Sequence, residues 1–340
     1  MRGTVKRIFP GNNSIRGFFS YYDSNLREAE RVFVLKGGPG TGKSSLMKGL
    51  AAEFLEKGCD VELWRCSSDP DSLDGIWIPH CGAAVVDGTS PHVVEPRYPG
   101  VKEEIVDLGD CWDEAKLMRR KEDIVALTDR ISEAFGRAYE HLADVGEADG
   151  AVLACRREDD RAVAEAEALM AGLCGDSPVG MRHFFASAVT PKGVVDLTLE
   201  LCRPMAQRWF FLGKRGLGQQ KCFADLAKRG FRTEVGHGCF DPDEVAVMLF
   251  PDLGLAVAAV ATLPPSERRD DDVVIAFEHR GEEDAGALAR REMYRAAAVA
   301  EIALAHSLHD ELEACYIPAM DFAKVEKRTK NIARKITKKV

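Results

Sequence analysis

The chain has 340 residues, of which 46% are hydrophobic and 30% charged, and its formal net charge is −9. This length fits two modules of about 150 to 180 residues better than one, and the acidic balance gives no global reason to expect nucleic acid as a partner. No stretch is apolar for long enough to be a secretion signal or a membrane span, and the ten cysteines form no C-x-x-C pair. We therefore expect a soluble cytoplasmic protein with reduced thiols.

A short apolar strand followed by a glycine-rich loop is the first strong pattern along the chain. Residues 32–35 (VFVL) predict a buried parallel strand. Residues 37–44 (GGPGTGKS), here called the first loop, satisfy every position of the phosphate-binding pattern G-x-x-x-x-G-K-[ST]. Apolar residues spaced four apart then predict a helix that Gly58 ends. These residues are Leu46, Leu50 and Phe54.

The residue types of the first loop suit a nucleotide phosphate. Glycines allow successive backbone N–H groups to turn toward one anion, and the following helix N-terminus adds partial positive charge. Lys43 would reach the β and γ phosphates, and the Ser44 hydroxyl would complete a Mg²⁺ shell. The predicted nucleotide-binding residues are Gly37, Gly38, Pro39, Gly40, Thr41, Gly42, Lys43, Ser44 and Ser45.

Acidic residues follow the next two predicted strands. After the strand at 60–65 comes the segment 66–74 (CSSDPDSLD), in which Asp69, Asp71 or Asp74 could orient water or a substrate hydroxyl. Asp69 is the catalytic candidate of this segment, and the alternative is a plain turn. The apolar run 83–86 ends at Asp87, which we expect to bind Mg²⁺ and to contribute to catalysis.

Between about residues 112 and 174 the sequence predicts a helical hairpin. Apolar residues from Ile124 to Leu142 advance by three or four and mark one helix face, and a second helix is expected over 157–173. We expect this hairpin to pack on the first half of the chain. The alternative is a lid that brings a cation over the nucleotide. Its candidate cations are Arg97, Arg119 and Arg120.

The second half of the chain repeats the first. A shift of 176 residues pairs Gly37, Gly40 and Gly42 with glycines, and a shift of 172 pairs Asp69-Pro70-Asp71 with Asp241-Pro242-Asp243. Because turn residues have specific backbone requirements, matches in this order predict an internal duplication. We expect an active domain over 1–178, the first half, and a related domain over 179–340, the second half.

Residues 213–221 (GKRGLGQQK), the second loop, are a degenerate copy of the first. Gln219 and Gln220 stand where the first loop has Lys43 and Ser44, and Ala259 stands where the first half has Asp87. The sequence therefore predicts that the second half keeps the shape but loses phosphate and metal binding. The alternative is a replacement phosphate cation within this loop. Its candidates are Lys214, Arg215 and Lys221.

The chain ends in a basic segment, 324–340, with eight Lys or Arg and one Glu, so that its formal charge is 8 − 1 = +7. We expect a basic helix docked on an acidic body, while binding of nucleic acid or anionic lipid stays open as the alternative.

The combination of motifs resembles an uncharacterised bacterial family of tandem P-loop proteins, usually labelled ATPase or nucleotide kinase. The resemblance extends from near the start to residue 322. The motifs are RGFFSYYD at 16–23, KGGPGTGKSSLMK at 36–48, CSSDPDSLDG at 66–75, VVDGTSPHVVEP at 85–96, TPKGVVD at 190–196 and MDF at 320–322. The resemblance implies an α/β fold of duplicated P-loop domains with mainly parallel sheets, plus inserted and C-terminal helices. It also implies ATP binding through Gly37, Gly42, Lys43, Ser44 and Asp87. This chain departs from the family in its second loop.

Two functions follow as expectations. The first is a Mg²⁺-dependent ATPase or ATP-driven switch that uses the first loop and acts on an unknown protein or small-molecule partner. The second is a small-molecule or nucleotide kinase that transfers the γ-phosphate of ATP, which would need an acceptor pocket. The chain shows no N-K-x-D guanine motif and no L-S-G-G-Q transporter signature.

Overall fold

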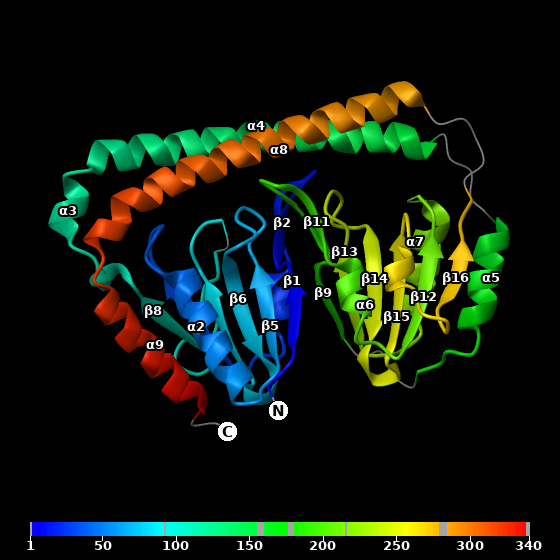
Figure 1. Cartoon of the computed structure of the whole chain (residues 1–340), viewed down its shortest axis with the longest axis horizontal. Helices are drawn as coiled ribbons and strands as arrows, with labels where there is room; N and C mark the ends of the chain where they lie inside the picture. Colours follow the sequence, from blue (N-terminus) through cyan, green and yellow to red (C-terminus); the bar gives the residue numbers. More distant parts are fainter. Residues whose placement is uncertain are drawn as a thin grey trace.

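The computed structural model describes residues 2–91, 93–154, 160–175, 180–214, 216–278 and 284–337. It is an α/β structure in which two six-stranded sheets lie beside each other beneath two long helices (Figure 1). No helix in these ranges is both long and apolar enough to cross a membrane, and the nine cysteines they include are free thiols.

The first sheet is mixed and largely parallel. Its third strand runs antiparallel to both neighbours, whereas the other five strands share one direction. In spatial order the strands are β1 (Val5–Ile8), β5 (Val61–Arg65), β6 (Leu73–Ile78), β7 (Ala83–Asp87), β4 (Arg31–Lys36) and β8 (Glu103–Asp107). The predicted strands at 32–35, 60–65 and 83–87 are confirmed.

The second sheet has the same order and the same strand directions. Its strands are β9 (Met181–Phe185), β13 (Thr233–His237), β14 (Val245–Phe250), β15 (Leu255–Val260), β12 (Gln207–Leu212) and β16 (Val273–Ala276). The pairing register also matches: Leu35 lies opposite Asp87 in the first sheet, and Phe211 lies opposite Ala259 in the second. These pairs are related by the shifts of 176 and 172 residues found in the sequence.

Each half also contributes a small hairpin to the boundary between the sheets. The hairpins are β2 (Gly11–Ser14) with β3 (Gly17–Ser20), and β10 (Ser187–Thr190) with β11 (Gly193–Asp196). The Asn12 side chain joins them, because it accepts from the N–H of Val189 over 3.0 Å and donates to the Cys239 carbonyl. Phe9 and Phe185 exchange two backbone hydrogen bonds beside them.

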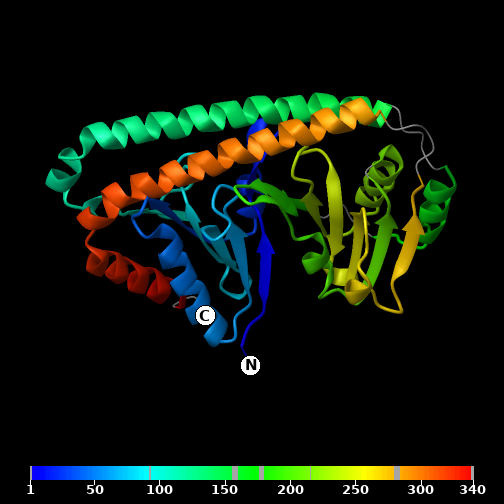
Figure 2. The ribbon, with the colours of Figure 1, turned by 45° about the horizontal axis from the view of Figure 1, so that its top comes forward.

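The long helices α4 (Lys121–Ala154) and α8 (Ala285–Tyr316) run antiparallel along each other and span both sheets (Figures 1 and 2). The sequence predicted that α4 would pair with the next helix in a hairpin over 112–174. That pairing is wrong, because α4 packs along α8. Helix α5 (Asp160–Met170) instead packs in the second half, in one apolar core with α7 (Leu217–Ala227). The apolar period of a helix identifies a buried face but not the element that covers it.

Helix α9 (Phe322–Thr337) returns the chain to the first half. Four of its side chains share a core with α2 (Lys43–Glu56), namely Val325, Ile332, Ala333 and Ile336. Its basic residues pair with carboxylates of the body, Arg328 with Asp110 and Lys335 with Glu104. The sequence assigned this segment to the second half. In the structure α5, which follows α4, packs in the second half, whereas α9, which follows α8, packs in the first half.

The remaining helices are short. They are α1 (Tyr22–Asn25), η1 (Pro79–Cys81), η2 (Gly109–Cys111), α3 (Glu114–Met118), α6 (Thr198–Cys202), η3 (Pro251–Leu253), η4 (Pro265–Glu267) and η5 (Ile317–Ala319).

Candidate functional site

The first loop joins the C-terminal end of β4 to the N-terminus of α2. β4 is buried between β7 and the edge strand β8, and α2 begins at Lys43 with Gly42 as its N-cap. Gly40 and Gly42 have φ values of 64° and 86°, a region that strongly favours glycine. The predicted order of strand, glycine loop and helix is confirmed.

Lys43 is folded back onto the loop. Its Nζ donates to the carbonyl oxygens of Gly37 and Gly38, both over 2.8 Å. It also lies 3.5 Å from Oδ2 of Asp87, and the two side chains are only 11% and 14% exposed. The cation and the carboxylate that the sequence singled out are therefore together, because β7 is the parallel neighbour of β4.

Ser44 and Asp87 supply oxygen atoms to the same edge of the sheet. The Ser44 hydroxyl accepts a hydrogen bond from the N–H of Leu73 over 3.1 Å, and Oδ1 of Asp87 accepts from the N–H of Thr89 over 2.9 Å. Hydroxyl and carboxylate oxygens are suitable Mg²⁺ ligands, with water and phosphate oxygens completing the shell. The described residues contain no cluster of three or more His, Cys, Asp or Glu suited to a metal ion.

Asp69 lies in a tight turn near this edge. Its Oδ1 accepts from the N–H of Asp71 over 3.1 Å, and its Oδ2 accepts from the Ser72 hydroxyl. Both carboxylate oxygens are thus used inside the turn. Asp74 follows in the antiparallel strand β6 and is buried.

The Asp-Pro-Asp turns have a role that the sequence did not suggest. Asp71 of the first half pairs with Lys192, which lies in the β10–β11 turn of the second half, over 2.7 Å. Reciprocally, Arg16 in the β2–β3 turn pairs with Asp243 of the second half. Each turn therefore contacts the hairpin of the other half through an ion pair.

The end of α8 covers the first loop. The N–H of Gly40 donates to Oε1 of Glu313 over 3.1 Å. A Cβ atom at Gly38 would lie 2.9 Å from the Tyr316 ring, and one at Gly40 would lie 3.0 Å from Ile317. These contacts could not be predicted from the sequence, since no local pattern links residue 313 to a loop 273 residues away.

Two of the three lid arginines pair with carboxylates. Arg97 lies 3.0 Å from Asp23, and Arg120, in the turn before α4, lies 2.6 Å from Asp123 in the first turn of that helix. Arg119 is exposed at the end of α3. A role of these arginines over a nucleotide stays a prediction.

The second loop keeps the order of strand, loop and helix, but its glutamines fill it. Gln219 is 1% exposed; its Oε1 accepts from the N–H of Gly216, and its Nε2 donates to the Phe211 carbonyl, both over 3.2 Å. Gln220 bonds both backbone groups of Val245 over 2.9 Å. The side chains of both glutamines are therefore hydrogen-bonded to the protein's own backbone, and Gln219 takes the N–H of Gly216 in the loop.

The proposed replacement cations differ in position. Lys221 pairs with Glu167 of α5 over 3.1 Å, and Lys214 follows β12 directly in the loop. Arg215 lies outside the described residues.

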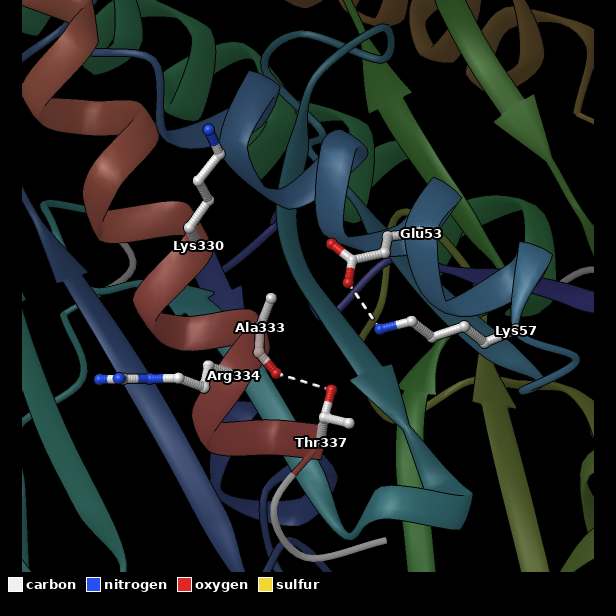
Figure 3. Close-up of a pocket in the computed structure, with 6 residues that line it drawn as sticks. All are labelled: Glu53, Lys57, Lys330, Ala333, Arg334 and Thr337. Carbon is white, nitrogen blue, oxygen red and sulfur yellow. Dashed lines mark hydrogen bonds and ion pairs between the residues drawn. The ribbon is translucent and has the colours of Figure 1, made fainter.

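A groove of about 390 Å³ lies between α2 and α9 (Figure 3). It is lined by Glu53, Lys57, Lys330, Ala333, Arg334 and Thr337. Glu53 stands ten residues after Lys43, which corresponds to about 15 Å along a helix. The groove is therefore separate from the first loop, and its Lys57 is paired with Glu53.

Comparisons with protein-family models, with curated proteins and with solved structures found no match to this chain.

Proposed function

We propose that the first loop binds ATP together with Mg²⁺ and that the protein is an ATPase or an ATP-driven switch. The observation that carries this proposal is the position of Lys43 at the start of α2, 3.5 Å from Asp87 on the neighbouring parallel strand. A lysine, a glycine loop with two left-handed glycines and a carboxylate are the groups that phosphoryl transfer requires.

In this proposal each group of the chain has one task. Lys43 would release the carbonyls of Gly37 and Gly38 and turn its charge to the β and γ phosphates. The N–H groups of the loop would bind phosphate oxygens, aided by the N-terminus of α2. Ser44 and Asp87 would hold Mg²⁺, which would neutralise charge on the phosphates.

We further infer that the chain arose by duplication of a P-loop domain and that the second half is a pseudo-site. The equal strand order and pairing register support the duplication. Gln219, buried at the position equivalent to Lys43, supports the loss of phosphate binding, because it already accepts from the loop N–H of Gly216.

The cover over the loop favours a switch over a kinase. Helix α8 contacts the first loop through Glu313 and extends along α4 over the second sheet, so movement at the loop can reach both halves (Figure 2). Kinase activity is the alternative, in which the γ-phosphate passes to a small molecule.

Phosphate release tests the proposal and separates the alternatives. Purified protein with Mg²⁺ and ATP should release phosphate without any acceptor, and Asp87→Ala should reduce this rate at least tenfold, because a metal ligand is lost. The Asp107→Ala variant, at the exposed end of β8, is the matched control and should keep the rate. Transfer to a nucleoside, nucleotide or sugar in the absence of release would favour the kinase instead.

A further inference from the structure

Glu313 lies where a phosphate oxygen would have to bind. Its Oε1 accepts a hydrogen bond from the N–H of Gly40, a backbone donor of the loop for which we propose phosphate binding. One N–H cannot donate in full strength to a carboxylate and to a phosphate oxygen at the same time. The Glu313 carboxylate therefore occupies a backbone N–H that a phosphate oxygen would also need.

The chemistry of Glu313 agrees with this geometry. The neighbouring His309 side chain and the N–H of Gly40 both lower the pKa of the Glu313 carboxyl, although burial opposes them. The group is thus an anion at neutral pH. Its side chain is 38% exposed, so it can leave the loop for water without being pulled from a core.

The backbone that carries Glu313 also blocks the loop. A Cβ at Gly40 would lie 3.1 Å from the Glu313 carbonyl oxygen, and the Tyr316 ring stands over Gly38. The end of α8 therefore packs directly on Gly38 and Gly40. A phosphate bound on this side of the loop would need the last turn of α8 to move as well as the Glu313 side chain to rotate.

Contacts at the end of α8 connect this movement to other elements. The ring of Tyr316 packs edge-on against Trp112 at 5.9 Å, and the N–H of Asp113 donates to the Ala319 carbonyl over 2.8 Å. Helix α9 follows at once and shares its core with α2. The end of α8, η5 and α9 form one segment. This segment lies against the first half while Glu313 is hydrogen-bonded to Gly40.

We propose that Glu313 is a tethered carboxylate that competes with the phosphates of ATP for the first loop, so that nucleotide binding releases the end of α8. This regulation rests on the proposed function of the loop. Since coupling between two binding events is reciprocal, ATP weakens the docking of α8 by the same factor by which docked α8 weakens ATP.

Affinity measurements on the full chain test the competition. Glu313→Ala removes the competitor and should bind Mg²⁺–ATP about tenfold more tightly than the wild type, as expected for loss of one charge-assisted hydrogen bond. Glu311→Ala is the matched control, because it removes the same charge from an exposed position on the same helix. Its affinity should stay within about twofold of the wild type.

Hydrogen exchange provides a second readout. Saturating ATP should speed exchange in peptides covering residues 313–329 of the wild type while it slows exchange in the first loop. In Glu313→Ala the same peptides should exchange rapidly without ATP.

The results that contradict the proposal are distinct from those that contradict ATP binding. Equal or weaker affinity in Glu313→Ala, with binding still lost in Lys43→Ala, would overturn the competition and leave the ATP site intact. Unchanged affinity with a large loss of phosphate release would make Glu313 a catalytic group rather than a competitor. Absence of ATP binding in both the folded wild type and folded Glu313→Ala would overturn the proposed function and the competition with it.

Discussion

The backbone N–H groups of Gly40 and Gly216 stand at equivalent positions in the two halves, and each donates to a side-chain oxygen. Gly216 donates to Gln219 of its own loop over 3.2 Å, whereas Gly40 donates to Glu313 of a remote helix over 3.1 Å. Gln219 is 1% exposed, so its side chain is buried. The N–H of Gly216 is thus bonded to a buried acceptor, whereas the N–H of Gly40 is bonded to an acceptor that is 38% exposed.

Gln219 should be a structural residue of the second half. Gln219→Ala leaves the N–H of Gly216 and the carbonyl of Phe211 buried without their partner, which should cost about 1 to 3 kcal/mol of the free energy of unfolding. Urea unfolding measures this loss. Gln207→Ala removes an exposed glutamine and should cost less than about 0.5 kcal/mol. Equal unfolding midpoints for the two variants would contradict the assignment.

A buried ion-pair cluster should hold the two halves together. Arg182 of β9 pairs with Glu62 and Glu234, and these side chains are 11%, 4% and 11% exposed. Lys6 also lies 3.2 Å from Glu62 and 2.5 Å from Glu234. Arg182→Met leaves the two buried carboxylates to this partly exposed cation and should lower the free energy of unfolding by about 3 to 5 kcal/mol.

The control for this cluster is an exposed ion pair between the halves. Arg232 lies 3.1 Å from Glu28, and both side chains are largely solvated. Arg232→Met should therefore cost about 1 kcal/mol or less. A similar small loss for Arg182→Met, measured by the same denaturant titration, would show that the buried cluster contributes little.

The histidine pair at the boundary should make stability depend on pH. Nδ1 of His183 lies 2.9 Å from Nε2 of His237, and burial together with His183 lowers the pKa of His237 from 6.5 to about 3. Below pH 6.5 His237 binds a proton in the unfolded chain but stays neutral in the folded protein. Stability should therefore fall by about 1.4 kcal/mol per pH unit as the pH drops from 6.5 toward 3.

Denaturant titrations at pH 7 and pH 5 check this dependence above the range in which most carboxylates titrate. Between pH 7 and pH 5 the free energy of unfolding of His237→Gln should fall by about 2 kcal/mol less than that of the wild type. His80→Gln, which changes an exposed histidine of η1, should retain the wild-type slope. Parallel behaviour of all three proteins would mean that His237 takes up its proton in the folded state.

Local patterns predicted the elements around the first loop, but not what covers it. The apolar run before Gly37 and the period of Leu46, Leu50 and Phe54 are short-range signals, and β4 and α2 formed accordingly. Asp87 was placed correctly beside the loop because apolar strands of an α/β sheet tend to be parallel neighbours.

Long-range packing accounts for the predictions that were wrong or incomplete. The apolar face of α4 was visible in the sequence, but any amphipathic helix offers such a face, and the true partner is α8. The Asp-Pro-Asp turn was recognised, yet its pairing with Lys192 depends on a hairpin 121 residues away. The same holds for Glu313, whose hydrogen bond to Gly40 depends on where α8 ends.

Calorimetric titration of the intact protein with ATP in the presence of Mg²⁺ tests the central claim most directly. The account predicts one binding site per chain and loss of that site in folded Lys43→Ala, since the phosphates lose their main cation. Lys48→Ala, an exposed change on α2, should bind as the wild type does. Two sites of similar affinity, or one site that survives Lys43→Ala, would contradict the account.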